Sequence, residues 1–169
     1  LRESRGLCGT KEGCAEGDCG ACTVVVGELD PAAPGGVRLT ALNACIQFLP
    51  ALDGKAVFTV EGIRAAEGGL HPAQQAMVDC HGSQCGFCTP GIVMSLWAHY
   101  TNALDDGTRP SPEAVRSALS GNLCRCTGYR PILDAAQRMF ELPAAPFDRR
   151  ALRDRLRSLD TGTPLDLPH

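Results

Sequence analysis

Two patterns of hydrophobic residues divide the chain. From about residue 22 to 62, short runs rich in β-branched residues (CTVVVGEL, VRLTALNAC and AVFTVEG) are separated by turn sequences such as DPAAPGG and LDGK. Runs of this kind are typical of strands. From about residue 71 to 141, apolar residues recur at helical spacing instead, as Leu96 and Tyr100 do. The pattern predicts a small sheet followed by helices.

Four segments of the second half carry a proline near their start, where helices favour it: HPAQQAMVDC, TPGIVMSLWAHY, SPEAVRSAL and RPILDAAQRMF. Thr89 and Ser111 are expected to be the N-caps of the second and third of these helices. Four short helices predict a bundle, and the glycine-rich EGIRAAEGGL between the two halves is the expected connection.

The tail FDRRALRDRLRSLDTGTPLDLPH mixes arginines and aspartates, as a solvated helix face does. Leu152, Leu156 and Leu159 nevertheless recur at helical spacing, so one side of it can dock on a neighbour. The prolines near the end favour a linker over residues 143–169. Because the chain starts with LRESRGL, without Met, we expect it to begin inside an element of a longer polypeptide.

Composition and motifs exclude several classes of function. The apolar fraction of 44% is that of a globular protein, and the net charge of −3 comes with no basic stripe for nucleic acid. No apolar run approaches the roughly 18 residues of a membrane span. The sequence contains no glycine-rich nucleotide loop, no Ser/His/Asp set and no open-site metal triad. We therefore expect no bond chemistry from this chain alone.

Ten cysteines call for an explanation. They are Cys8, Cys14, Cys19, Cys22, Cys45, Cys80, Cys85, Cys88, Cys124 and Cys126. An even, dense set of cysteines can indicate a secreted disulfide framework. Here the cysteines form tight groups, and cysteines one or two residues apart do not readily pair with each other. The spacing therefore favours metal ligation over disulfides.

The first group of cysteines has the spacing of a plant-type 2Fe-2S site. Cys14, Cys19 and Cys22 read C-x4-C-x2-C, and Cys45 follows further along. The residues between them are small, chiefly glycine and alanine, which lets the backbone pass close to a cluster and turn through positive φ. Zinc usually takes two compact cysteine pairs, so the three-plus-one arrangement favours iron and sulfide.

The second group consists of two pairs, Cys85 with Cys88 and Cys124 with Cys126, about forty residues apart. Each pair precedes one of the proline-started helices. Two helix N-termini would present free N–H groups and positive dipole ends to a negatively charged thiolate site. Spacing alone leaves two alternatives open here, an iron-sulfur cluster and a structural zinc ion.

Three motifs together resemble a known family. GTKEGCAEGDCGACTVVV, QCGFCTPGIVMS and GNLCRCTGYRPI are similar to the iron-sulfur region of the molybdenum hydroxylases, and most similar to the FAD/iron-sulfur subunits of bacterial xanthine dehydrogenases. The resemblance implies an α+β architecture in which a truncated β-grasp, ferredoxin-like 2Fe-2S domain is followed by a four-helix bundle 2Fe-2S domain. Their expected bounds are residues 1–63, with the N-terminus missing, and 70–142, with 143–169 as a linker toward a flavin domain.

The resemblance also implies site residues. The first cluster would be held by Cys14, Cys19, Cys22 and Cys45, and the second by Cys85, Cys88, Cys124 and Cys126. Gln84 would contact the pterin of the molybdenum cofactor. Cys8 and Cys80 are left over and are expected to act as small buried hydrophobes.

The function implied is electron transfer within a xanthine dehydrogenase-like molybdenum hydroxylase, from the molybdenum-pterin centre through two 2Fe-2S clusters to FAD and NAD. FAD and the molybdenum cofactor would lie on neighbouring domains or subunits, a molybdenum-binding subunit among them, in a cytoplasmic enzyme. Two alternatives are kept. One is a separate iron-sulfur small subunit of an aldehyde, carbon monoxide or aromatic hydroxylase, and the other is a zinc-stabilised interaction module without a redox role.

Overall fold

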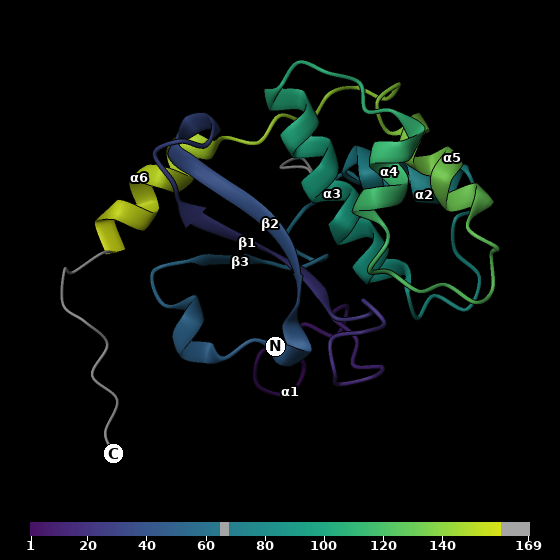
Figure 1. The fold of residues 1–169 in the computed structure, drawn as a ribbon, viewed down its shortest axis with the longest axis horizontal. Helices are drawn as coiled ribbons and strands as arrows, with labels where there is room; N and C mark the ends of the chain where they lie inside the picture. Colours follow the sequence, from purple (N-terminus) through teal and green to yellow (C-terminus); the bar gives the residue numbers. More distant parts are fainter. Residues whose placement is uncertain (65–67, 160–169) are drawn as a thin grey trace.

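The chain folds as a small sheet beside a group of helices (Figure 1), in a computed structural model that describes residues 1–64 and 68–159. The strands are β1 (Thr23–Leu29), β2 (Val37–Asn43) and β3 (Ala56–Phe58). The helices are α1 (Arg2–Arg5), α2 (Pro72–Asp79), α3 (Thr89–Asp105), α4 (Pro112–Ala118), α5 (Arg130–Arg138) and α6 (Arg149–Leu159). Short 3₁₀ turns are η1 (Pro34–Gly36), η2 (Ala44–Ile46) and η3 (Leu49–Leu52). The three predicted strands and the four proline-started helices are thereby confirmed.

Strand β1 is the centre of an antiparallel sheet with the order β2-β1-β3. Val25 lies opposite Ala41 of β2 and Phe58 of β3. Val24, Val25 and Val26 are all buried, so both faces of β1 are covered. This explains why β1 reads as an uninterrupted apolar run rather than as an alternation of apolar and polar residues.

The first and third of the proline-started helices carry side-chain caps. His71 caps α2, where its Nδ1 accepts a hydrogen bond from the N–H of Ala73 and Gln74 completes a capping box. The side chain of Ser111 caps α4 by accepting from the N–H of Ala114, as the sequence predicted. These caps satisfy backbone donors that a helix start otherwise leaves without a partner.

The predicted N-cap of α3 is wrong by one residue. Cys88 occupies the cap position, and Thr89 is the first residue of the helix. The Thr89 hydroxyl bonds instead to the hydroxyl of Ser83, at 2.7 Å. The cysteine is therefore fixed directly at the helix start.

None of the helices within residues 1–64 and 68–159 has the length and apolar character needed to cross a lipid bilayer.

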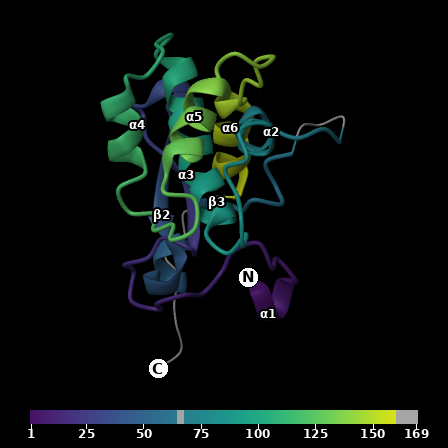
Figure 2. The ribbon, with the colours of Figure 1, turned by 90° about the vertical axis from the view of Figure 1, so that its right-hand side faces the viewer.

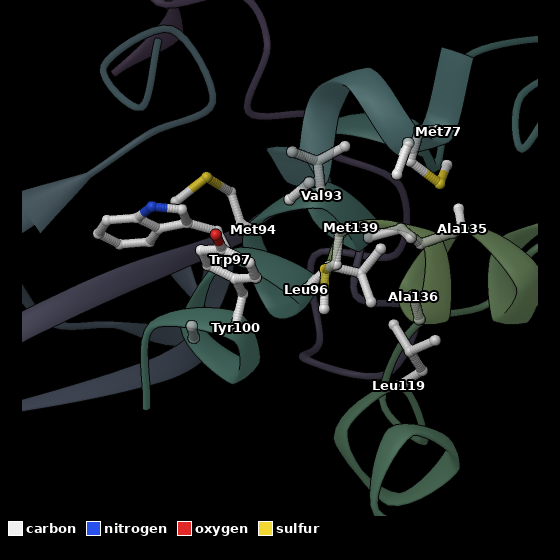
Figure 3. Close-up of a cluster of buried hydrophobic side chains, with 14 of the residues drawn as sticks. Met77, Val93, Met94, Leu96, Trp97, Tyr100, Leu119, Ala135, Ala136 and Met139 are labelled. Carbon is white, nitrogen blue, oxygen red and sulfur yellow. The ribbon is translucent and has the colours of Figure 1, made fainter. Parts of the chain in front are cut away.

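One apolar core extends from the helices to the sheet. Helix α3 packs on β1 and β2, and α2, α4 and α5 gather around α3 on the side away from the sheet (Figures 1 and 2). Figure 3 shows the centre of this core, where Leu96 and Tyr100 of α3 lie near Met139, which follows α5. Val25 of β1 belongs to the same cluster of buried residues. The two halves predicted from the sequence therefore share apolar packing through α3.

The tail contains a helix, α6, that packs on the sheet. Leu156 is buried, and the side chain of Leu152 lies over Gly27 of β1. Leu159, which shares their spacing, is exposed. The docking side foreseen from the leucine spacing is thus confirmed for the first two leucines. Residues 160–169 lie outside the described residues, as do 65–67 of the predicted connection.

Arg149 anchors α6 although it is charged and only 4% exposed. Its guanidinium donates to the carbonyl of Val37 at 2.8 Å, to Oδ1 of Asn102 at 2.6 Å and to the carboxylate of Asp105 at 2.5 Å. A buried cation is tolerated when its donors are paired in this way. One side chain thus ties α6 to both β2 and α3.

Glycines permit the closest contact between the two halves. A Cβ on Gly91, in the first turn of α3, would collide with the carbonyl oxygen of Gly20, in the loop before β1. Gly20 itself has φ of 70°. A Cβ added to Gly20 would likewise collide with the carbonyl oxygen of Gly121, in the loop after α4. The loop before β1 therefore lies directly against α3 and against the loop that leads to α5.

Substituting Gly91→Ala should destabilise the protein, since the added methyl group meets backbone rather than a side chain that can move. Overpacking of this kind costs about 1–3 kcal/mol, which exceeds the gain in helix propensity from alanine. The free energy of unfolding, from denaturant titration, measures the effect. Gly121→Ala is the matched control because a Cβ there meets nothing within 4 Å. Equal free energies of unfolding for the two variants would show that Gly91 does not pack tightly against the Gly20 carbonyl.

Candidate metal centres

The antiparallel pairing of β1 and β2 brings two distant cysteines together. Cys22 directly precedes β1, and Cys45 lies in η2, just past the end of β2. Because Thr23 pairs with Asn43, the start of β1 lies beside the end of β2. The N–H of Cys45 accordingly points at the sulfur of Cys22, at 3.5 Å. The sheet register thus places the fourth cysteine of the first group.

Cys14 and Cys19 join them from the loop before β1. The sulfur of Cys14 accepts hydrogen bonds from the N–H groups of Asp18 and Cys19, at 3.3 and 3.4 Å. The pKa of Cys14 is lowered to about 6 by hydrogen bonds, first from the N–H of Glu16, then from the N–H groups of Cys19 and Asp18 and from the Cys19 thiol. Hydrogen bonds to a thiolate favour its charged form, the form that binds metals.

The thiol of Cys45 completes the first group. Burial, above all, and then the neighbouring thiol of Cys22 raise the pKa of Cys45, and the charge of Cys14 acts in the same direction. Each of the four cysteines thus has another of the group as its neighbour. The structure brings together Cys14, Cys19, Cys22 and Cys45.

Small residues shape the loop around this group. A Cβ on Gly13 would lie 3.0 Å from the sulfur of Cys19, and one on Gly17, where φ is 81°, would overlap Ile46. Ala15 adopts φ of 57°, which side chains rarely do. Asn43 donates a hydrogen bond to the carbonyl of Gly17 and so holds the loop to the end of β2. At Gly13 and Gly17 the loop therefore leaves little space for a side chain.

The second group forms where two helices begin. Cys88 is the N-cap of α3, and Cys124 and Cys126 lie in the loop before α5. Burial and the thiol of Cys124 raise the pKa of Cys88 to about 12. The N–H of Phe87 and the thiol of Cys126 lower the pKa of Cys85. The two pairs that lie apart in the sequence are therefore neighbours in space, Cys85 beside Cys126 and Cys88 beside Cys124.

Thr127 and Tyr129 hold Cys124 in place. Burial disfavours the Cys124 thiolate, but the hydroxyl and N–H of Thr127 lower its pKa, and the hydroxyl lies 3.2 Å from the sulfur. The N–H of Cys124 donates to the phenol oxygen of Tyr129 at 2.9 Å. Tyr129, with φ of 68°, turns the chain into α5. The cysteine is thus fixed on both its backbone and its sulfur.

The donor sets fit a cluster with two metal atoms. Each group supplies four thiols and no imidazole or carboxylate, which is the ligand set of a 2Fe-2S cluster. Among the described residues, no three His, Cys, Asp or Glu side chains surround one point as the ligands of a single ion would. A two-iron cluster does not require such convergence because its thiolates divide between two irons.

The remaining candidates lie as follows. Gln84 is exposed and directly precedes Cys85. Cys80 is partly buried and packs on the apolar core, as predicted, and burial raises its pKa. Cys8 is exposed, so the prediction that it is a small buried hydrophobe is wrong.

Sequence reasoning missed the polar residues that support the cysteines. Thr127 and Tyr129 stand beside the cysteines in GNLCRCTGYRPI. The hydroxyl of a Thr three residues after Cys124 could have indicated a hydrogen bond to that sulfur. Asn122 is buried and bonds to the loop of the other group, about a hundred residues earlier in the sequence. No local pattern indicates a contact over that distance.

Comparisons with known proteins indicate the same class of domain. The family model described as "[2Fe-2S] binding domain" matches residues 59–137. The xanthine dehydrogenase of Emericella nidulans is 58% identical over 132 residues, and the xanthine dehydrogenase/oxidase of Gallus gallus is 53% identical over 134. These matches cover 78% and 79% of this chain and 9% and 10% of those proteins. The chain thus spans about a tenth of the length of these relatives.

Two solved structures share the fold. Quinoline 2-oxidoreductase from Pseudomonas putida 86 matches with a TM-score of 0.67 and 33% identity, over 94% of this chain and 81% of that one. The aldehyde oxidoreductase from Desulfovibrio gigas matches with a TM-score of 0.67 and 34% identity, over 94% of this chain and 15% of that one. The chain belongs to the molybdenum hydroxylase family and is an iron-sulfur region of such oxidoreductases.

Proposed function

We propose that this chain is the electron-transfer component of a xanthine dehydrogenase-like molybdenum hydroxylase. The observation that carries the proposal is the gathering of eight cysteines into two four-thiol groups that lie against each other, with the N–H of Leu123 donating to the carbonyl of Cys19 at 3.0 Å. Two neighbouring sites that each take up one electron are suited to passing single electrons from one site to the other. The identity of about half of all aligned residues to xanthine dehydrogenases supports the same function.

We infer two cofactor-binding units and a connection. Residues 1–63 would form a ferredoxin-like β-grasp domain around the first group, and residues 70–142 a four-helix bundle around the second, built from α2 to α5. Residues 143–169 would lead toward a flavin domain, with α6 as their docked part. The proposed ligands are Cys14, Cys19, Cys22 and Cys45 for the first cluster, and Cys85, Cys88, Cys124 and Cys126 for the second.

The residues of the chain would hold, shield and tune the clusters. A bound 2Fe-2S cluster accepts and releases one electron at a time, which is the chemistry it supplies here. N–H groups directed at the sulfur of Cys14 stabilise negative charge there, and the Thr127 hydroxyl does so at Cys124. Such hydrogen bonds raise the potential at which a site takes up an electron. The route proposed runs from molybdenum-pterin through both sites to FAD and NAD.

Surface features support the proposed neighbours. Gln84 is exposed directly beside Cys85, where it is free to contact a pterin on another domain or subunit. Ile46, Phe48 and Leu49, which follow Cys45, are 51%, 81% and 83% exposed. Exposed apolar residues gathered beside a site mark a contact surface. The proposal therefore includes a molybdenum-binding partner and a flavin domain, in a cytoplasmic enzyme.

A second candidate is a separate iron-sulfur subunit of an aldehyde, carbon monoxide or aromatic hydroxylase. It is favoured by the quinoline 2-oxidoreductase chain, 81% of which this chain covers. Xanthine-dependent reduction of NAD by the intact complex would support the first candidate. Activity on aldehydes, carbon monoxide or aromatic rings, without activity on purines, would support the second.

Metal analysis and visible absorption test the proposal as a whole. Protein purified without oxygen should contain about four irons and four labile sulfides per chain, two of each in every cluster. It should be coloured by sulfide-to-iron charge transfer and show two distinct signals when reduced. Stoichiometric zinc in place of iron would refute the proposal and leave the interaction module.

Single cysteine substitutions should separate the two sites. Cys85→Ser or Cys124→Ser should remove the signal of one reduced cluster and about two irons per chain, and leave the other signal largely intact, because each site loses one of its four thiolates. Electron paramagnetic resonance and iron analysis measure this. Cys8→Ser and Cys80→Ser are the matched controls and should keep both signals. Loss of a cluster in either control would show that the ligand sets are assigned wrongly.

Gln84→Ala should keep both clusters but slow their reduction by substrate. The loss would be about 10- to 100-fold, the usual effect of removing a hydrogen-bonding group next to a metal site. Stopped-flow absorption follows cluster reduction in the intact complex. Gln75→Ala, on α2, is the control. Unchanged rates in Gln84→Ala would argue against the pterin contact.

A further inference from the structure

A single backbone hydrogen bond connects the two cysteine groups. The N–H of Leu123 donates to the carbonyl of Cys19, at 3.0 Å. Cys19 belongs to the first group, and Leu123 directly precedes Cys124 of the second. The peptide atoms of these three residues and one hydrogen bond therefore form a continuous connection between the groups. Phe87 touches Gly13 nearby, where a Cβ on the glycine would lie 3.2 Å from the ring.

Asn122 fixes this connection from the side. It is 4% exposed, and its Nδ2 donates to the carbonyl of Gly20 and to the hydroxyl of Thr23, both at 3.1 Å. Its Oδ1 accepts from the hydroxyl of Ser95 at 2.7 Å. The amide thus bonds to the first cysteine loop, to β1 and to α3, while its own backbone belongs to the second cysteine loop.

The Asn122 amide joins this junction as both donor and acceptor. The Gly20 carbonyl also accepts from the N–H and the hydroxyl of Thr23, and Asn122 adds a third donor while its Oδ1 accepts from Ser95. A buried polar network whose members are all paired specifies one arrangement of the chains around it. Asn122 therefore holds Gly20 and Leu123 at fixed positions, and with them the adjacent Cys19 and Cys124.

We propose that Asn122 is a positioning residue that sets the electronic coupling between the two cysteine groups, by keeping the Cys19 carbonyl bonded to the Leu123 amide. This proposal rests on the proposed function. One electron leaves one site, which is oxidised, and reduces the other. No proton accompanies it through the junction, because the side-chain amide and the two peptide groups are neutral and keep their protons.

Asn122→Ala in the intact holoprotein tests this inference. It leaves the carbonyl of Gly20 with fewer donors and loosens the junction, so exchange of the Leu123 amide hydrogen should accelerate about tenfold, as expected for loss of one buried hydrogen bond. Hydrogen exchange with mass spectrometry reads this directly. The magnetic interaction between the two reduced clusters, seen as splitting of their resonance signals, should weaken, and electron equilibration between them should slow.

Two further variants keep the test decisive. Ser95→Ala leaves Asn122 in place but removes the hydroxyl that orients it, and should produce a smaller change of the same kind. Ser111→Ala loses a comparable hydrogen bond at the start of α4, away from the junction, and should change neither the exchange of Leu123 nor the splitting. If Asn122→Ala does not assemble both clusters, Ser95→Ala alone decides the question.

The outcomes separate this inference from the proposed function. Both clusters present, with faster exchange, weaker splitting and slower equilibration, supports the inference. Faster exchange at Leu123 with unchanged splitting and unchanged equilibration overturns it. Wild-type protein without iron and sulfide would refute the proposed function instead, before any variant is compared.

Discussion

The arrangement of the whole molecule depends on how closely three backbone segments approach one another around the carbonyl of Gly20. Gly91 has no side chain to keep α3 away from it, Gly20 has none to keep away the backbone of Gly121 in the loop after α4, and Asn122 supplies a hydrogen bond to the carbonyl. Glycine favours such approaches, and the Asn122 donor joins the N–H and the hydroxyl of Thr23 on the buried oxygen. The sheet, the longest helix and both cysteine loops therefore meet at one place, and the other contacts between the halves follow from it.

Much of the architecture could be predicted because its determinants are local. The β-branched run of β1, the prolines at the starts of α2 to α5 and the cap at Ser111 each act within a few residues. The cysteine groups could also be predicted, since ligand spacing is itself a local property. The three-plus-one spacing predicted that Cys45 would join Cys14, Cys19 and Cys22, and the register of β1 and β2 places it beside Cys22.

What could not be predicted depends on distant partners. The charged tail has the composition of a solvated helix face, yet Arg149 is buried, because its partners are a carbonyl of β2 and two side chains of α3. Cys88, rather than Thr89, occupies the N-cap position of α3, and the threonine hydroxyl bonds to Ser83. In both places the residue type suggested one environment, and a hydrogen-bond partner elsewhere in the fold gave the side chain a different one. Residue type alone does not identify such partners.

The sequence distance between contacting residues has a consequence for assembly. The four thiols of the first group lie within residues 14–45, whereas the second group is incomplete until residue 126, and Asn122 reaches Gly20 across 102 positions. Closing a longer loop costs more chain entropy, and domains form from the N-terminal end during synthesis. The thiols of the first group can therefore come together while α2 to α5 are still being made. The contacts between the two cysteine loops form later, and the contact of Arg149 with Val37, across 112 positions, forms later still.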